Sequence, residues 1–307
     1  MPSYVRANDL DDVTELLWAD GPNAQLIAGG TDLLVRPGAM REKALVVDIS
    51  RVPSLLRIVQ EDDGWLTVGA GVTHERIARD PLLRRKARLL GLACGAVGSL
   101  QIRNRGTLGG NLGNASPAAD SLPALACLDA RVRLTARSRQ RDVPLAVFFT
   151  GPGATSREPD ELIEAVRLPP RRGREVAFFK KAGQRLGMCC SKASVALLAR
   201  RHGDGRLSDV RVALGAVAPT VLAVPEAAAV LEGQRLEPGV IRAAAAACTA
   251  AANPIDDIRS SAGYRRRVVG ALLSEGLLEA RDHLLQLERR RRRRRQRARS
   301  KGRSSRR

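Results

Sequence analysis

The stretch 107-TLGGNLGNASPAAD-120 decides how the rest of the chain is interpreted. It holds three glycines, two asparagines and one proline within fourteen positions. This composition is typical of a loop and not of a helix or strand of that length. Because glycine has no Cβ, the stretch predicts a backbone that approaches another group unusually closely.

A second glycine turn lies in 25-QLIAGGTDLLV-35, between two short apolar segments. Amide groups in a tight glycine turn can converge on a phosphate group. Short polar side chains near the two turns add hydrogen-bonding capacity, namely Thr31, Thr107, Asn111, Asn114 and Ser116. Asp120, at a predicted helix start, is placed to accept from a ribose hydroxyl. The two turns together suit a dinucleotide with a diphosphate, although each turn alone is equally explained by simple chain reversal.

The common nucleotide-binding fingerprints are missing from the sequence. There is no G-x-G-x-x-G opening a helix after a strand and no G-x-x-x-x-G-K-[ST]. The segments 69-GAGVTH-74 and 151-GPGATS-156 lack the third glycine. The sequence therefore disfavours a Rossmann-type nicotinamide site and a P-loop.

Strand-like and helix-like patterns alternate along the chain, which indicates an α+β protein of two domains. A Pro/Gly/Arg cluster, 168-LPPRRGRE-175, marks the boundary between residues 1–172 and 173–287. Apolar runs at 144–149 and 161–169 are of strand length. Beyond the boundary, three runs predict an antiparallel meander followed by helices. These runs are 176–183, 190–201 and 207–218.

The net charge of +20 is concentrated at the end of the chain. Residues 289–307 include 13 basic and no acidic residues, so about +7 remains for residues 1–288. A like-charged run of this kind predicts a disordered arginine-rich tail over 288–307. Two interpretations stay open: a solvated appendage, or an arm that binds polyanions non-specifically.

Metal and membrane sites are disfavoured by the composition. The five cysteines form no metal-ligand spacing with one another or with the histidines, so we expect no metal site in this chain. No apolar run is long enough to span a membrane, and the first residues do not resemble a signal peptide, so we expect a cytoplasmic protein.

Four segments follow one another as in a known family: AGGTDLL, GAGVTHERIA, GSLQIRNRGTLGGNLGNASPAADSLPAL and IDDIRSSAGYRRRVVGALL. In them the chain resembles the FAD-binding (medium) subunit of the molybdenum hydroxylases, such as xanthine dehydrogenase and carbon monoxide dehydrogenase. The resemblance covers about residues 1–285. It implies a vanillyl-alcohol-oxidase-type FAD-binding domain of two α+β subdomains. A smaller C-terminal domain with a three-stranded antiparallel sheet and helices would follow.

The resemblance also implies a set of cofactor-binding residues. Two loops would cradle the FAD diphosphate, Asp120 would reach the adenosine ribose, Val97 and Ile163 would pack on the cofactor, and Lys180 would lie beside the flavin. The loop residues are Ile27, Ala28, Gly29, Gly30, Thr31, Asp32 and Leu33 in the first loop, and Thr107, Leu108, Gly109, Gly110 and Asn111 in the second. The neighbouring Lys181 leaves the lysine register open. His74 is interpreted as a helix cap or as part of the cofactor shell.

The implied function is electron transfer within an oxidoreductase. Electrons would pass from a small [2Fe-2S] subunit and a large molybdopterin subunit to FAD in this chain, and then to NAD or a quinone. A dimer of heterotrimers is expected, with no catalytic acid or base in this chain. Met188, Cys189 and Cys190 stand where the family often has an acidic or aromatic residue, which leaves the acceptor open. The alternatives are a basic-tailed nucleic-acid-associated protein and a free-standing flavin oxidase.

Overall fold

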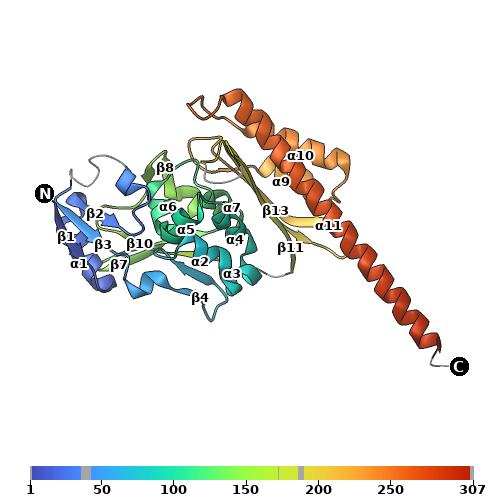
Figure 1. The fold of residues 1–307 in the computed structure, drawn as a ribbon, viewed down its shortest axis with the longest axis horizontal. Coiled ribbons are helices and arrows are strands. Elements are labelled where there is room, and N and C mark those ends of the chain that lie inside the picture. Colours follow the sequence, from blue (N-terminus) through green and yellow to red (C-terminus); the bar gives the residue numbers. More distant parts are fainter. Residues whose placement is uncertain (1, 36–42, 172, 186–189, 305–307) are drawn as a thin grey trace.

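The computed structural model describes residues 2–35, 43–171, 173–185 and 190–304, with side chains described as far as residue 286. Two α+β subdomains occupy the first half of the chain, and a third unit of sheet and helices follows (Figure 1). The last helix, α11, runs along this third unit and projects well beyond the rest of the molecule.

The first subdomain is a small parallel sheet with one long helix. The strand order is β1-β3-β2, and both outer strands pair in parallel with β3. Val13 and Leu17 of the helix are buried against Val47 and form a separate small core. The elements are β1 (Ser3–Arg6), α1 (Leu10–Asp20), η1 (Gly21–Asn23), β2 (Ala24–Ile27), η2 (Leu33–Val35) and β3 (Leu45–Asp48).

The second subdomain is an antiparallel sheet in the order β4-β5-β10-β6-β7, with helices packed against it. Val68, Val132 and Val166, from three adjacent strands, are fully buried in the main core together with residues of the helices. The strands are β4 (Ile58–Gln60), β5 (Leu66–Gly69), β6 (Arg131–Ala136), β7 (Arg139–Pro144) and β10 (Leu162–Leu168), with a separate pair β8 (Phe149–Gly151) and β9 (Ala154–Thr155). The helices are η3 (Pro53–Leu56), α2 (His74–Arg79), α3 (Pro81–Lys86), α4 (Arg88–Gly95), α5 (Leu100–Arg105), α6 (Leu108–Asn114), α7 (Ser121–Cys127) and α8 (Leu145–Phe148).

The C-terminal unit is built on an antiparallel sheet in the order β11-β12-β13-β14. The three long strands match the predicted meander, and the structure adds a two-residue fourth strand that pairs with β13. The elements are β11 (Arg174–Ala182), β12 (Ala193–Arg201), β13 (Leu207–Gly215), β14 (Leu222–Ala223), α9 (Pro225–Leu231), α10 (Pro238–Ala251) and α11 (Ala262–Ser304).

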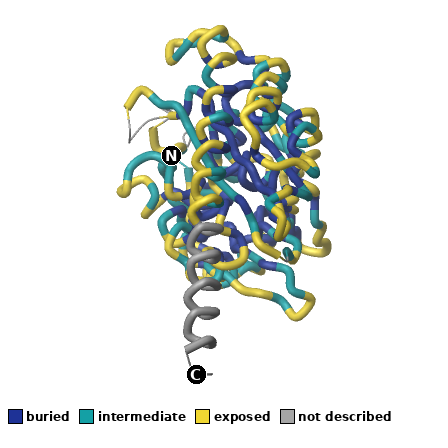
Figure 2. Tube along the Cα trace, turned by 90° about the vertical axis from the view of Figure 1, so that its right-hand side faces the viewer, coloured by how far each residue is buried: buried dark blue, intermediate teal, exposed yellow. Residues whose placement is uncertain are grey.

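The central strand of this sheet is buried on both faces, which explains its continuous apolar sequence. Leu197 packs into the core formed with α9, α10 and α11. The neighbouring Leu198 points to the other face and belongs to the core of the second subdomain. Figure 2 shows the buried residues gathered in the interior of the molecule, with exposed residues on its outside. The two halves of the chain therefore share a continuous apolar contact.

The stretch predicted as a loop contains a short helix, α6, and the loop prediction is wrong there. Thr107 is its N-cap, and the Thr107 hydroxyl accepts from the Gly110 amide at 3.1 Å. Leu108 and Leu112, on one face, are fully buried. Burial of these two side chains outweighs the low helix propensity of the glycines.

The run 144–149 was predicted as a strand, but most of it forms the single helical turn α8. Leu145 and Phe148 lie three residues apart, and both are buried. One helical turn directs both side chains into the core, whereas a strand would direct them to opposite faces.

The sequence predicts a disordered tail over residues 288–307, which stays a prediction; the structure continues the backbone of α11 to Ser304 (Figure 1). Arginine is a good helix former, and each residue added to an existing helix gains one backbone hydrogen bond. Met188 and Cys189 lie outside the described residues, and Cys190 is exposed. Among the described residues, no helix is long and apolar enough to cross a membrane.

The shared core generates a stability prediction. We expect Leu198→Ala to lower the free energy of unfolding by about 2–5 kcal/mol, because it leaves a cavity between the sheet and the second subdomain. Leu278→Ala on α11, where the side chain is 40% exposed, should change it by less than about 0.5 kcal/mol. Urea unfolding of both variants measures the difference; equal effects would contradict a shared core.

Candidate functional site

The two glycine loops meet backbone to backbone. A Cβ at Gly29 would lie only 1.9 Å from the carbonyl oxygen of Arg105, the last residue of α5. Gly30 adopts a φ of +72°, in the region that favours glycine. Only glycine at these positions lets the loop after β2 lie directly on the end of α5.

The second loop is held in place by its own hydrogen bonds. The His74 amide donates to the Gly106 carbonyl at 3.0 Å, and the Gly109 amide donates to the Ala70 carbonyl at 2.8 Å. A Cβ at Gly109 would lie 2.5 Å from the Ala70 Cβ. Gly109 therefore serves the close packing of α6 against the loop after β5.

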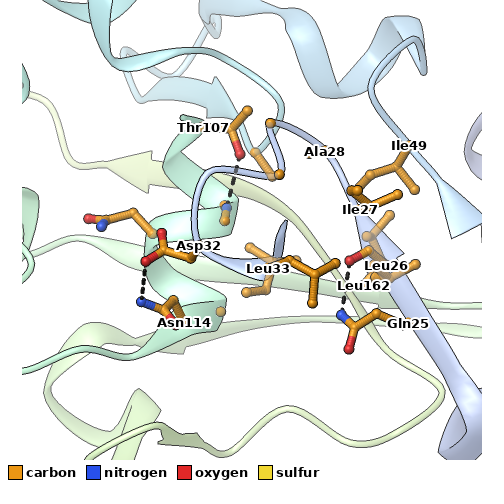
Figure 3. Close-up of a pocket in the computed structure, with 18 of the residues that line it drawn as sticks. Gln25, Leu26, Ile27, Ala28, Asp32, Leu33, Ile49, Thr107, Asn114 and Leu162 are labelled. Atoms are coloured by element: carbon orange, nitrogen blue, oxygen red, sulfur yellow. Dashed lines mark hydrogen bonds between the residues drawn. The ribbon is translucent and has the colours of Figure 1, made fainter. Parts of the chain in front are cut away.

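A pocket of about 580 Å³ lies between these loops. Its wall combines the end of β2, the start of α6 and the strand β10, and Figure 3 shows these segments surrounding it. Asn114 donates to the Asp32 carboxylate at 3.3 Å and so links the two loops across one side. The size is in the range of small-molecule and cofactor sites.

Most of the residues that the sequence associates with the cofactor line this pocket. They are Ile27, Ala28, Gly29, Gly30, Thr31, Asp32, Leu33, Val97, Thr107, Gly109, Gly110, Asn111 and Ile163. The apolar members Ile27, Leu33, Val97 and Ile163 come from three separate segments. The wall is thus suited to a ligand with both an apolar and a polar part.

The first loop offers backbone donors to the pocket. Within the described part of the chain, the amides of Gly29, Gly30, Thr31 and Asp32 donate no hydrogen bond. In the second loop, by contrast, the amides of residues 108–111 are all used within the protein. Neighbouring free amides are the donors that a phosphate group requires. The residues present therefore fit a diphosphate.

Three predicted residues do not line the pocket: Leu108, Asp120 and Lys180. Leu108 is fully buried in the main core. Lys180 donates to Glu275 at 2.9 Å and to Glu279 at 2.6 Å, both on α11. Its side chain therefore lies on the helix-covered face of the C-terminal sheet.

The adjacent Lys181 takes the opposite direction, as alternation along a strand requires. Its ammonium donates to the Ala96 carbonyl at 2.6 Å and to the Asp120 carboxylate at 2.7 Å. Ser191 also donates to Asp120, at 2.5 Å. Burial raises the pKa of Asp120, and the contacts with Lys181 and Ser191 oppose that shift. Asp120 and Lys181 thus form a buried ion pair that is bonded to Ala96, the residue before the lining residue Val97.

The sequence analysis missed part of the wall, formed by Gln25, Gly153, Arg157 and Pro159. The Arg157 guanidinium donates to the Glu161 carbonyl at 2.6 Å and holds this loop in place. A Cβ at Gly21 would lie 2.6 Å from the Pro159 carbonyl oxygen. The near-miss segment 151-GPGATS-156, which supplies Gly153, was the available signal.

His74 lines the pocket and is 2% exposed, whereas the helix cap beside it is Thr73. Its Nδ1 lies 3.4 Å from the Cys94 sulfur. Burial lowers the pKa of His74 to about 4, with a smaller contribution from the Arg103 charge. The ring is therefore neutral at pH 7 and supports the wall.

The geometry describes a protein with a cofactor pocket between two α+β subdomains, and comparisons with known proteins define its family. Residues 1–171 match the family described as the FAD binding domain in molybdopterin dehydrogenase. Residues 177–280 match the CO dehydrogenase flavoprotein C-terminal domain. The chain belongs to this family of FAD-binding subunits.

Similar proteins span nearly the same length. The nicotine 6-hydroxylase medium subunit of Paenarthrobacter nicotinovorans is 32% identical over 90% of this chain and 96% of its own. The putative xanthine dehydrogenase FAD-binding subunit of Escherichia coli K12 is 32% identical over 91% and 95%. Among solved structures, the carbon monoxide dehydrogenase of Hydrogenophaga pseudoflava matches with a TM-score of 0.84, at 29% identity, over 91% of this chain and 96% of that one.

These comparisons confirm the predicted family and the α+β fold with an FAD-binding domain followed by a C-terminal sheet domain. They also confirm that the chain is an oxidoreductase subunit of the xanthine dehydrogenase and CO dehydrogenase type.

The lowered pKa of His74 generates a pH prediction. The unfolded chain binds a proton at His74 below about pH 6.5, whereas the folded chain binds it only near pH 4. The stability linked to a neutral His74 is present above pH 6.5 and is lost as the pH falls to 4, by about 3 kcal/mol.

We expect His74→Gln to reduce this fall in the free energy of unfolding, measured by urea titration at several pH values. His202→Gln is the matched control, since His202 is exposed and bonded to Ser208. A wild-type slope in the His74→Gln variant would contradict the assignment.

Proposed function

We propose that this chain is the electron-transfer subunit of a heterotrimeric molybdenum hydroxylase. FAD in this chain would receive electrons from a small [2Fe-2S] subunit, and substrate oxidation would take place on a large molybdopterin subunit. The single observation that supports FAD binding most directly is the row of amides at residues 29–32, which donate no hydrogen bond within the described part of the chain and belong to residues that line a pocket with apolar walls.

The pocket residues divide into two groups by the part of FAD that they suit. The free amides of the first loop suit the diphosphate, and the side chains of Thr107 and Asn111 add donors beside it. Val97 and Ile163 supply apolar surface for the flavin ring. When bound, FAD supplies the capacity to accept and release electrons, and the protein supplies position and electrostatics.

We propose two revised roles. Lys181, and not Lys180, would take the position beside the flavin, because Lys180 is bonded to two carboxylates of α11. Asp120, which accepts from Lys181 and Ser191, would hold these two side chains in place of reaching the ribose.

The pocket wall argues against a free-standing flavin oxidase. Among the described lining residues, the titratable side chains are Asp32, Lys43, His74 and Arg157. Lys43 and Arg157 donate to backbone carbonyls, and His74 is buried and neutral. Such a wall binds and orients a cofactor but does not present a nucleophile paired with a base.

The remaining parts of the proposal rest on the family resemblance. We propose a dimer of heterotrimers in the cytoplasm, with NAD or a quinone as electron acceptor. We also propose that residues 1–172 form the FAD-binding domain and residues 173–287 the C-terminal domain.

The proposed function predicts which variant loses FAD. In Gly110→Val, the added side chain enters the pocket, since a Cβ at Gly110 meets only the Thr107 hydroxyl, at 3.0 Å. We expect this variant to purify folded but without the yellow flavin absorbance of the wild-type chain. Gly239→Val is the control, because a Cβ there meets nothing within 4 Å. Stoichiometric FAD in Gly110→Val would remove the second loop from the binding site.

A further prediction of the proposed function concerns the arginine-rich tail. Deletion of residues 289–307 removes 13 positive charges and should leave the melting temperature and the FAD content unchanged. Non-specific binding to a DNA duplex should fall, and in the full chain it should weaken steeply with salt because it depends on counterion release. An alternative role of the tail is to hold the chain in the complex, and size-exclusion chromatography of the truncated chain with the partner subunits tests it. An FAD subunit that elutes alone after truncation would assign the tail to assembly.

A further inference from the structure

The turn between α4 and α5 carries two carbonyl groups that each accept from a cationic side chain. Lys181 of β11 donates to the Ala96 carbonyl at 2.6 Å. Arg103 of α5 donates to the next carbonyl, that of Val97, at 3.2 Å. Val97 itself lines the pocket. We call Arg103, Lys181 and these two carbonyls the carbonyl clamp.

Each cation of the clamp is held by a carboxylate on its other side. Arg103 pairs with Glu75 of α2 at 2.7 Å, and the two side chains are 19% and 13% exposed. Lys181 pairs with Asp120 at 2.7 Å, with 14% and 6% exposure. Charge-assisted bonds of this kind are stronger and more directional than neutral ones.

The turn needs this external support. Its two carbonyls follow the last residues of α4, where helix carbonyls have no partner within the helix. Gly98, the next residue, has a φ of +43°, and α5 has only six residues. A helix of that length is unstable by itself. Cations are also favoured at helix C-termini.

The negative charge of Glu75 is balanced mainly by Arg103. The hydrogen bond with the Arg103 guanidinium is the largest cause of the lowered pKa of Glu75, and the hydrogen bond with Arg79 makes a smaller contribution. Arg79 pairs with the same carboxylate at 2.5 Å, but its side chain is 75% exposed and it bonds to no carbonyl of the turn. Removal of Arg103 would leave the Glu75 carboxylate paired only with the exposed Arg79.

We propose that Arg103 is a positioning residue for the flavin part of FAD: through the carbonyl clamp it fixes Val97 in the pocket wall, and it neutralises Glu75, the residue that follows the lining residue His74. This inference rests on the proposed FAD site. Arg103 acts through Val97 and Glu75 and does not itself need to touch the cofactor. An uncompensated anion near a flavin disfavours its reduced form, so the clamp also raises the reduction potential.

The test uses the full chain, with FAD itself as the probe. We expect Arg103→Gln to weaken FAD binding about tenfold in a flavin-fluorescence titration and to lower the midpoint potential measured by spectroelectrochemistry. Arg79→Gln should leave both quantities unchanged. Arg103→Lys keeps the charge and should restore the potential while giving an intermediate affinity.

A double variant separates position from charge. Arg103→Gln combined with Glu75→Gln should recover the potential but keep the weakened FAD binding, because the Val97 carbonyl still lacks its donor. If Arg103→Gln unfolds, the Arg103→Lys variant carries the comparison. Arg103 variants that match Arg79→Gln in both affinity and potential would overturn the inference alone. A wild-type chain that binds no FAD would overturn the proposed function and this inference together.

Discussion

Gly29 lies so close to the Arg105 carbonyl that no side chain fits between them, and the arrangement of the pocket follows from this contact. It fixes the loop after β2, which belongs to the parallel sheet, on the end of α5 in the other subdomain. Residues 29–32, whose amides donate no hydrogen bond within the described part of the chain, then line the cavity. A phosphate-binding turn needs this kind of support, because its donors gain nothing from partners within the protein.

The two glycine-rich loops have similar sequences but different physical roles. In the first, the glycines permit the close contact and a positive φ, and the amides stay available to a ligand. In the second, the amides are used by α6 and by Ala70, and Gly109 is required for packing. The second loop therefore contributes shape and side chains such as Thr107 and Asn111.

The sequence was sufficient to predict the class of fold, and most of the residues that it associates with the cofactor line the pocket, since these predictions depend on local patterns. The apolar run at β12 and the two glycine turns are examples. The failures depend on contacts between distant residues. The helix α6 forms because Leu108 and Leu112 find a core, which no local propensity reveals. The choice between Lys180 and Lys181 depends on strand register, where a shift of one residue exchanges the two faces.

The FAD-binding domain of this chain depends on contacts from outside its own segment. Lys181 comes from β11, outside the segment that matches the FAD-binding family, yet it supplies the cation for the buried carboxylate of Asp120. Removal of one partner from a buried ion pair costs about 3–5 kcal/mol, since the other charge is left without compensation. A fragment that ends near residue 171 would therefore leave the Asp120 carboxylate without Lys181, lose the support of the Ala96 carbonyl and expose the apolar surface that normally meets Leu198. The C-terminal domain thus supports the FAD-binding domain through contacts that lie outside the pocket lining.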